Sequence, residues 1–291
     1  MSGVERRDSG TEVLGELLVL GDDAAGTSVS VSPKRGGIVT SFRVRDRELL
    51  YMDEGTLRDP TKNVRGGVPV LFPNPGRLSG DAFSFRGVAS RLSQHGFARA
   101  NPWTVVATGA DGPASATLAL ADSATTRAAF PFPFHVEIGL SLRGASLGYT
   151  ATVENTGPTD LPYALGFHPY FVVRDKAAAR IDTRATRAFD NVTKKTGPFT
   201  GFDLAAGEVD LHLVDHGSAD GALHIDGGTV HVRASADFVR WVVWTLPGKD
   251  FVCLEPWTAP GGALNTGESL TVLAPGATRT SFMEIAWEAS G

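Results

Sequence analysis

One glutamate lies in an otherwise apolar segment, where burying a charged carboxylate costs free energy, and this makes it a candidate for a chemical role. Glu255 closes the run Phe251-Val-Cys-Leu-Glu255, directly before Pro256. In an extended strand Cys253 and Glu255 share one face, and both faces of the run are otherwise apolar. Burial raises the pKa of such a carboxyl toward that of a useful general base. The alternative is an exposed glutamate at the end of the strand. Cys253 is predicted to pack in the core, because a nearby carboxylate disfavours a thiolate.

Two histidines have neighbours that favour a chemical role. His168 lies in Gly166-Phe-His-Pro-Tyr-Phe171, where the following proline favours an extended backbone and the rings restrict water. A partly desolvated imidazole of fixed direction suits proton transfer near neutral pH. His95, in Ser93-Gln-His-Gly-Phe97, belongs to a polar loop where a ligand could be contacted. For each, the alternative is a structural histidine.

Arginines are concentrated in one segment. Residues 65–99 hold no lysine, the single acid Asp81 and five arginines, Arg65, Arg77, Arg86, Arg91 and Arg99. The segment therefore has a net charge of +4, whereas the whole chain has −5. Arginine suits forked hydrogen bonds to carboxylates, phosphates or sugar hydroxyls. Glycines and prolines around these arginines indicate loops, which commonly carry binding residues. The alternative is a set of solvated loop arginines.

A zinc-like spacing occurs at His212 and His216, four residues apart. Apolar residues alternate through 209–213, which predicts a strand, and a strand would separate the two histidines by roughly 13 Å. We therefore predict no metal site. Asp210 or Asp215 could accept hydrogen bonds from a polyhydroxylated ligand, or either could be an ordinary solvated acid.

Composition limits the partners. A net charge of −5 and a pI near 5.8 argue against nucleic acid as a ligand. The single cysteine, Cys253, excludes an intramolecular disulfide and a four-thiolate zinc site, which favours a reducing compartment. Residues 13–20 are mostly apolar, but Glu16 interrupts them and no cleavage motif follows, which argues against a signal peptide. No run approaches the 18 apolar residues that a membrane span requires. We expect a soluble, cytoplasmic protein with no membrane partner.

The elements that must position these side chains are strands. Apolar and polar residues alternate through 136–142 and 147–153 on either side of Gly144-Ala-Ser146, which predicts a hairpin. Similar alternation at 27–31, 230–232 and 283–287, with glycine- and proline-rich turns between, is typical of an all-β sandwich. The only segments that suggest helices, 121–129 and 176–180, are short. We predict a flexible N-terminus over 1–12 and one large antiparallel β-sandwich domain over 13–291.

Three motifs in order resemble the aldose 1-epimerase, or galactose mutarotase-like, superfamily. They are Gly166-Phe-His-Pro-Tyr-Phe171, Cys253-Leu-Glu-Pro256 followed by Asn265, and Leu273-Ala-Pro-Gly-Ala-Thr-Arg279. The resemblance extends from about Gly15 to Glu288 and implies a β-sandwich fold. It further implies that Glu255 is the general base, that His168 is the general acid and that His95 lies against the sugar. Arg77, in Pro75-Gly-Arg-Leu, resembles the substrate arginine of the family, and Asp210 resembles its substrate aspartate.

Other residues resemble a different branch of the superfamily. Gln94-His-Gly-Phe-Ala-Arg99 replaces the usual asparagine-histidine-leucine-histidine-glycine-glycine pattern. Together with Arg65-Gly-Gly-Val-Pro69 it looks like the glucose-6-phosphate 1-epimerase branch, in which arginines hold the phosphate. Arg65 and Arg99 are then candidate substrate-binding residues. His168-Pro169 instead resembles the mutarotase branch, so free and phosphorylated substrates both stay open.

The resemblance implies an isomerase that interconverts the α and β anomers of a hexose without a cofactor. Glu255 and His168, on opposite sides of the hemiacetal, would open and reclose the ring. One alternative is a hexose-6-phosphate 1-epimerase, and another is a carbohydrate-binding protein without turnover. The expected partner is a small sugar or sugar phosphate, and the expected assembly is a monomer or homodimer.

Overall fold

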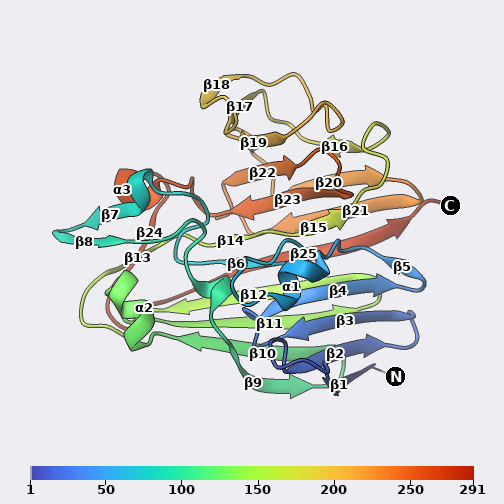
Figure 1. Cartoon of the computed structure of the whole chain (residues 1–291), viewed down its shortest axis with the longest axis horizontal. Helices are drawn as coiled ribbons and strands as arrows, with labels where there is room; N and C mark the ends of the chain where they lie inside the picture. Colours follow the sequence, from blue (N-terminus) through green and yellow to red (C-terminus); the bar gives the residue numbers. More distant parts are fainter. Residues whose placement is uncertain (1) are drawn as a thin grey trace.

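Antiparallel sheets make up most of the computed structural model, which describes residues 2–291 (Figure 1). The first sheet has five strands, in the order β1 (Ser2–Asp8), β2 (Glu16–Asp22), β3 (Thr27–Ser32), β4 (Ile38–Val44) and β5 (Arg47–Glu48). The second has eight, in the order β16 (Arg180–Asp182), β20 (Asp220–Ile225), β21 (Gly228–Ala234), β25 (Thr278–Ala289), β12 (Ser146–Glu154), β11 (His135–Arg143), β10 (Ala114–Ala121) and β9 (Thr104–Gly109).

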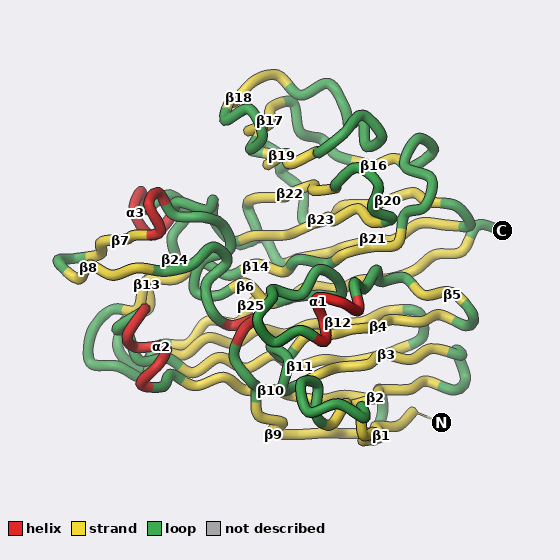
Figure 2. The backbone as a smooth tube through the Cα atoms, in the orientation of Figure 1, coloured by secondary structure: helices red, strands yellow, loops and turns green. Residues whose placement is uncertain are grey.

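The third sheet carries the candidate site. Its order is β18 (Lys195–Pro198), β17 (Arg187–Asp190), β19 (Val209–Leu213), β22 (Arg240–Thr245), β23 (Phe251–Trp257), β14 (Gly166–Phe167) and β6 (Val70–Leu71), with β15 (Tyr170–Val172) also paired to β23. Two small ladders join β7 (Ala82–Phe85) to β8 (Val88–Arg91) and β13 (Leu161–Tyr163) to β24 (Thr271–Leu273). Loops surround β17, β18 and β19 at the top of Figure 2.

Helices are few and short, as the sequence predicts. They are α1 (Glu54–Arg58), α2 (Ala124–Ala129) and α3 (Ala263–Thr266), with single 3₁₀ turns at Ser79–Asp81 and Ala98–Ala100. The expected helix at 121–129 corresponds to α2, which starts after Ser123 in a capping box with Thr126. The expected helix at 176–180 is wrong, because these residues form a turn that leads into β16. Within residues 2–291, none of the helices has the length and apolar character that crossing a bilayer requires.

The predicted hairpin is confirmed by β11 and β12. Their register runs from His135 opposite Glu154 to Arg143 opposite Ser146, which leaves a two-residue turn. Gly144 adopts a φ of 56° in that turn, a conformation that favours glycine. Alternate side chains of both strands are buried, so the period-two pattern corresponds to one face packed on the core. The all-β, antiparallel prediction is therefore confirmed.

The N-terminal segment 1–12, which the sequence predicts to be flexible, contains a strand, and its residue 1 lies outside the described residues. Residues 2–8 form β1, which pairs with β2 from Ser2 opposite Asp22 to Asp8 opposite Glu16. Strand pairing uses backbone groups, so a polar composition does not prevent it. The half-buried Val4 also packs against the core. The sequence-based expectation considered side chains only and missed this edge strand.

The hydrophobic core lies between the sheets. One buried cluster extends from Leu18 of β2 to Ile285 of β25 and includes Val243 and Leu254 of the third sheet. Because side chains alternate across a strand, the intervening residues of β22 and β23 face away from this cluster. That other face carries Val242 and Glu255, and it forms the floor of a cleft.

Candidate active site

Strand register assembles the floor of the cleft in rows. His212 of β19 lies opposite Val242 of β22, which lies opposite Glu255 of β23. The adjacent row contains Asp210, Trp244 and Cys253 in the same three strands. Directly opposed residues of antiparallel strands share a face. The cleft above has a volume of about 1220 Å³, ample for a sugar.

All seven site residues that the sequence predicts line this cleft: Arg65, Arg77, His95, Arg99, His168, Asp210 and Glu255. Segments far apart in the chain therefore meet in one place. His168 reaches the floor because β14 and β15, on either side of it, both pair with β23.

Glu255 and His168 lie side by side rather than facing each other across the cleft. Oε1 of Glu255 is 3.3 Å from Nδ1 of His168, and the side chains are 1% and 6% exposed. The atoms are not aligned for a hydrogen bond, so Nδ1 has no hydrogen-bond partner among the described residues. The His168 ring stacks on Tyr170 at 4.6 Å between centroids, and Trp257 Nε1 donates to Glu255 Oε2 at 3.1 Å. Both groups are thus fixed in orientation.

Burial gives each of these two groups a preference for its neutral form. It raises the pKa of Glu255 well above the ordinary 4.5, and the nearby negative charge of Asp210 adds to the effect. It lowers the pKa of His168 well below 6.5, and the positive charge of Arg99 acts in the same direction.

His95 is arranged as a hydrogen-bond acceptor toward the cleft. Its Nδ1 bonds to the Pro75 carbonyl, which requires a hydrogen on Nδ1 and leaves Nε2 as the acceptor. Gln94 donates to this Nε2 at 3.1 Å. Burial, followed by the positive charge of Arg99, lowers the pKa of His95 to about 3. The neutral ring lies 5.6 Å from that of His168, between centroids, and a sugar hydroxyl can donate to Nε2 in place of Gln94.

Asp210 is held by a short chain of polar contacts. Asn191 Nδ2 donates to its Oδ2 at 2.7 Å, while Nε2 of His212 lies 3.3 Å from its Oδ1. Lys194 in turn donates to Asn191 Oδ1 at 2.6 Å. The β17–β18 turn therefore fixes the carboxylate at one end of the cleft.

The cleft cations differ in how they are compensated. Arg77 is paired with Asp81 at 3.3 Å, and its side chain is 69% exposed at the rim. Four other cations have no acid within ion-pair distance among residues 2–291: Arg65, Arg99, Arg187 and Lys194. Positive charge without a partner therefore faces the cleft.

Several lining residues were missed from the sequence. His212 was considered only as a metal ligand with His216, yet His212 lines the cleft while His216 is bonded to Thr183 and the Asp220 carbonyl. Trp257, of unassigned role, packs against His95 and His212 as well as bonding Glu255. The sequence could have indicated His212, because the alternation in the predicted strand places it on the same face as Asp210.

One group of side chains has the makeup of a metal site. Atoms of His168, Cys253 and Glu255 that could coordinate a cation lie within 4.8 Å of one another, and all three residues are buried. Burial raises the pKa of the Cys253 thiol well above 9.0, so the neutral thiol is favoured. Two members of the group, His168 and Glu255, are also the candidate catalytic pair. That the protein uses no metal stays a prediction from the sequence.

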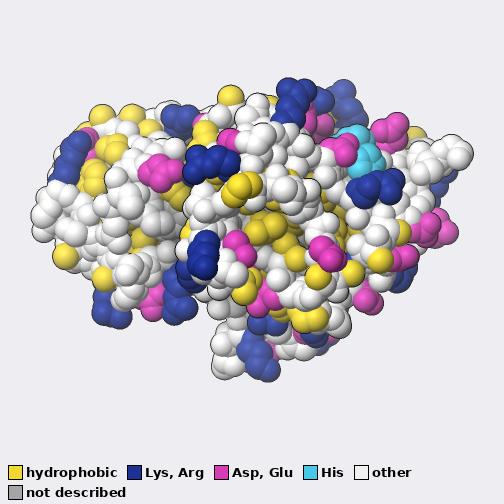
Figure 3. Space-filling model, turned by 90° about the horizontal axis from the view of Figure 1, so that it is seen from above, with side chains coloured by type: hydrophobic (Ala, Val, Ile, Leu, Met, Phe, Trp, Pro, Cys, Tyr) yellow, Lys and Arg dark blue, Asp and Glu magenta, His cyan; other side chains and the backbone are white. Residues whose placement is uncertain are grey.

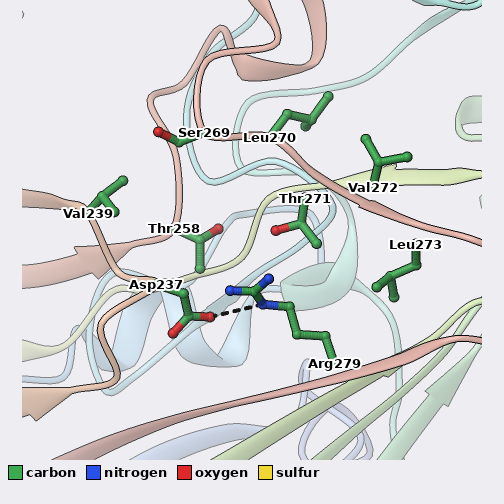
Figure 4. Close-up of a pocket in the computed structure, with 9 residues that line it drawn as sticks. All are labelled: Asp237, Val239, Thr258, Ser269, Leu270, Thr271, Val272, Leu273 and Arg279. Atoms are coloured by element: carbon green, nitrogen blue, oxygen red, sulfur yellow. Dashed lines mark ion pairs between the residues drawn. The ribbon is translucent and has the colours of Figure 1, made fainter.

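A second pocket, of about 330 Å³, lies next to β24 (Figure 4). The Arg279 guanidinium points toward Asp237, with 3.5 Å between Nε and Oδ2. Hydroxyls of Ser235 and Ser281 also donate to Asp237. These charges compensate each other, and none of the predicted site residues lines this pocket. The large cleft is therefore the candidate active site.

Comparison with known protein families identifies the family to which this chain belongs. The family model described as aldose 1-epimerase matches residues 16–286, which is nearly the whole chain. The chain belongs to the aldose 1-epimerase family. This confirms the resemblance seen in the sequence motifs.

Curated relatives of this aldose 1-epimerase family member match over part of their length. A protein of Cenchrus ciliaris, provisionally named glucose-6-phosphate 1-epimerase, is 27% identical over 172 residues, covering 55% of this chain and 49% of the relative. A protein of Salmonella typhimurium with the same provisional name is 28% identical over 152 residues, covering 51% and 46%. The chain thus spans about half the length of the curated relatives it matches.

Solved structures match over the full fold. The Slr1438 protein of Synechocystis sp. PCC 6803 is 34% identical with a TM-score of 0.92, covering 94% of this chain and 96% of that one. A galactose mutarotase-like protein of Clostridium acetobutylicum is 16% identical with a TM-score of 0.85, covering 99% and 98%. The second likeness shows the fold alone.

Proposed function

We propose that this protein interconverts the α and β anomers of a hexose by general acid–base catalysis. The observation that carries the proposal is the pair formed by Glu255 and His168, 3.3 Å apart on the floor of the large cleft. Both oxygens that exchange protons in mutarotation are bonded to C1 of the sugar. Two groups that serve them must therefore lie side by side, as these two groups do.

The reaction keeps its proton balance within the pair. In ring opening, the Glu255 carboxylate takes the proton of the C1 hydroxyl, the bond from C1 to the ring oxygen breaks, and protonated His168 gives a proton to that oxygen. Rotation about C1–C2 turns the free aldehyde. Reclosure returns both protons and yields the other anomer. The pair holds one proton before and after each step. The neutral form that burial favours and the reactive form, with Glu255 charged and His168 protonated, carry the same number of protons.

The surrounding residues supply orientation. One sugar hydroxyl donates to His95 in place of Gln94, another donates to Asp210, and Arg99 donates to the sugar from the lining of the cleft. Holding the ring in a reactive position accounts for a further part of the rate. Trp257 offers an apolar surface beside the catalytic carboxylate.

A hexose 6-phosphate is the second candidate substrate. The specific observation that favours it is the set of four cleft cations without an acidic partner among the described residues, Arg65, Arg99, Arg187 and Lys194. Arginine forks bind phosphate in a bidentate manner. The names of the curated relatives point to the same substrate.

Anomer exchange measured by NMR tests the chemistry. Glu255→Gln and His168→Asn should each lower kcat by roughly 10²- to 10⁴-fold, because each removes one proton-transfer partner. The far-UV circular dichroism of both variants should match that of the unmodified protein. An unchanged exchange rate in folded Glu255→Gln would refute the base assignment. Saturable sugar binding without any acceleration over buffer would instead identify a binding protein.

Substrate preference is tested on the unmodified protein with glucose and glucose 6-phosphate. A higher kcat/KM for the phosphate ester, lost in Arg99→Met but kept in Arg143→Met, supports the second candidate. Arg143 lies at the end of β11 and does not line the cleft. Equal kcat/KM values for both sugars would contradict phosphate recognition.

A further inference from the structure

Arg240 is a buried arginine whose donors are only partly used. It begins β22 and lines the cleft, and its side chain is 10% exposed. Nη2 contacts Glu268 Oε1 at 2.7 Å. Nε and Nη1 are buried and have no hydrogen-bond partner among residues 2–291.

Another arginine of the same chain shows what a structural role requires. Arg35 is as buried as Arg240, at 8% exposure for each residue. Arg35 donates to four backbone carbonyls, those of Thr56, Leu57, Asp59 and Lys62. Leaving buried donors unpaired costs free energy, so a native structure that does so usually has a reason. Structural burial is a complete explanation for Arg35 but not for Arg240.

The position of Arg240 suggests that reason. Arg240 lies opposite Trp257, while Val242, two residues further along β22, lies opposite Glu255. Two residues along a strand correspond to about 7 Å, which is comparable to the width of a pyranose with its substituents. A sugar with C1 at Glu255 can therefore extend one edge to Arg240. Glu268 lines the cleft at the same end.

We propose that Arg240 and Glu268 form a subsite for ring hydroxyls of the aldose, at the edge of the sugar away from C1. The inference rests on the proposed function for the placement of C1. Hydroxyls fit both partners, because their oxygens accept from Nε and Nη1 and their hydrogens are donated to the carboxylate. Phosphate fits less well here, since Glu268 already compensates the guanidinium charge. The uncompensated cations lie elsewhere in the cleft.

Substitution at Arg240 tests the subsite. Arg240→Met should raise KM roughly ten- to hundredfold for glucose and glucose 6-phosphate alike, with little change in kcat, because it removes hydrogen bonds from a charged donor. Arg240→Lys keeps the charge near Glu268 but loses the fork, and should raise both KM values as well. Arg233→Met is the control, since it removes an exposed ion pair with Asp220 (2.9 Å) outside the cleft. KM values unchanged in both Arg240 variants, or a loss confined to the phosphate ester, would overturn the inference.

Deoxy sugars separate binding from mere folding damage. For at least one of 2-, 3- or 4-deoxyglucose, the loss of affinity in the Arg240 variants should be smaller than for glucose, because one of the hydroxyls that Arg240 binds is missing. A uniform loss across the whole panel would show a structural role and overturn the subsite.

The same binding measurement distinguishes this inference from the proposed function. Affinities are compared between Glu255→Gln and Glu255→Gln combined with Arg240→Met, by the fluorescence of the cleft tryptophans. Weaker binding in the double variant supports the subsite even if the unmodified protein shows no anomer exchange. If the unmodified protein shows anomer exchange but the two variants bind the sugar with equal affinity, the proposed function is supported and the subsite is overturned.

Discussion

Glu255 is an acid and His168 is a base, but burial favours the neutral form of both side chains. In water near neutral pH the carboxyl would be charged and the imidazole mostly neutral, whereas in the cleft both prefer the neutral form because burial penalises charge. Such a pair can accept and release protons at two adjacent atoms without a change in its total proton number. That property is what anomer exchange demands.

The pH profile of kcat/KM should therefore be bell-shaped. The active pair carries one proton in total, so activity is lost at low pH when the pair gains a second proton and at high pH when it loses its only one. Because the pKa of His168 is lowered, the acid limb should lie well below pH 6.5, and because the pKa of Glu255 is raised, the alkaline limb should lie well above pH 4.5. His95, with a pKa of about 3, stays neutral throughout. Rates corrected for buffer catalysis check this, and an acid limb centred at or above pH 6.5 would contradict it.

At the scale of the element, the 93–97 loop depends on a close backbone approach. Gly96 has a φ of +69°, and a Cβ there would lie 2.1 Å from the Phe72 carbonyl oxygen. The Gly96 site thus excludes any side chain, while the neighbouring His95 adopts a φ of 67° that non-glycine residues rarely take. The tight turn is what directs the His95 ring into the cleft.

Gly96→Ala should therefore damage both stability and catalysis. The clash must shift the loop, so the free energy of unfolding should fall by more than the ~1 kcal/mol expected of strain alone, and kcat/KM should fall as His95 is displaced. Gly248→Ala is the matched control, since Gly248 has a φ of +67° with nothing within 4 Å of the added Cβ. Urea unfolding and anomer exchange measure the two effects. Equal losses in both variants would show that the contact with Phe72 is unimportant.

For the whole molecule, charge is dispersed over the surface and concentrated in the cleft. Acidic and basic side chains are interspersed over the face shown in Figure 3, and the net charge is −5. A phosphorylated sugar would thus be attracted locally, by cleft arginines, against a mildly repulsive overall charge. The cleft draws its cations from segments as distant as Arg65 and Lys194.

Salt should consequently affect the two candidate substrates differently. Raising the ionic strength from about 0.01 to 1 M shortens the screening length from roughly 30 to 3 Å. The kcat/KM for glucose 6-phosphate should fall over this range, while that for glucose should change little. Parallel salt responses of the two sugars would argue against charge recognition in the cleft.

Alternation was sufficient to predict the antiparallel sandwich and the β11–β12 hairpin, and motifs with the family resemblance predicted seven of the residues that line the cleft. Those features are local, because they depend on residue type and on neighbours a few positions away. The adjacency of Glu255 and His168, the edge strand β1 and the unpaired donors of Arg240 emerged in the folded chain. Each depends on how distant segments pair, and register between such segments is set by packing of the whole core rather than by any short stretch of residues.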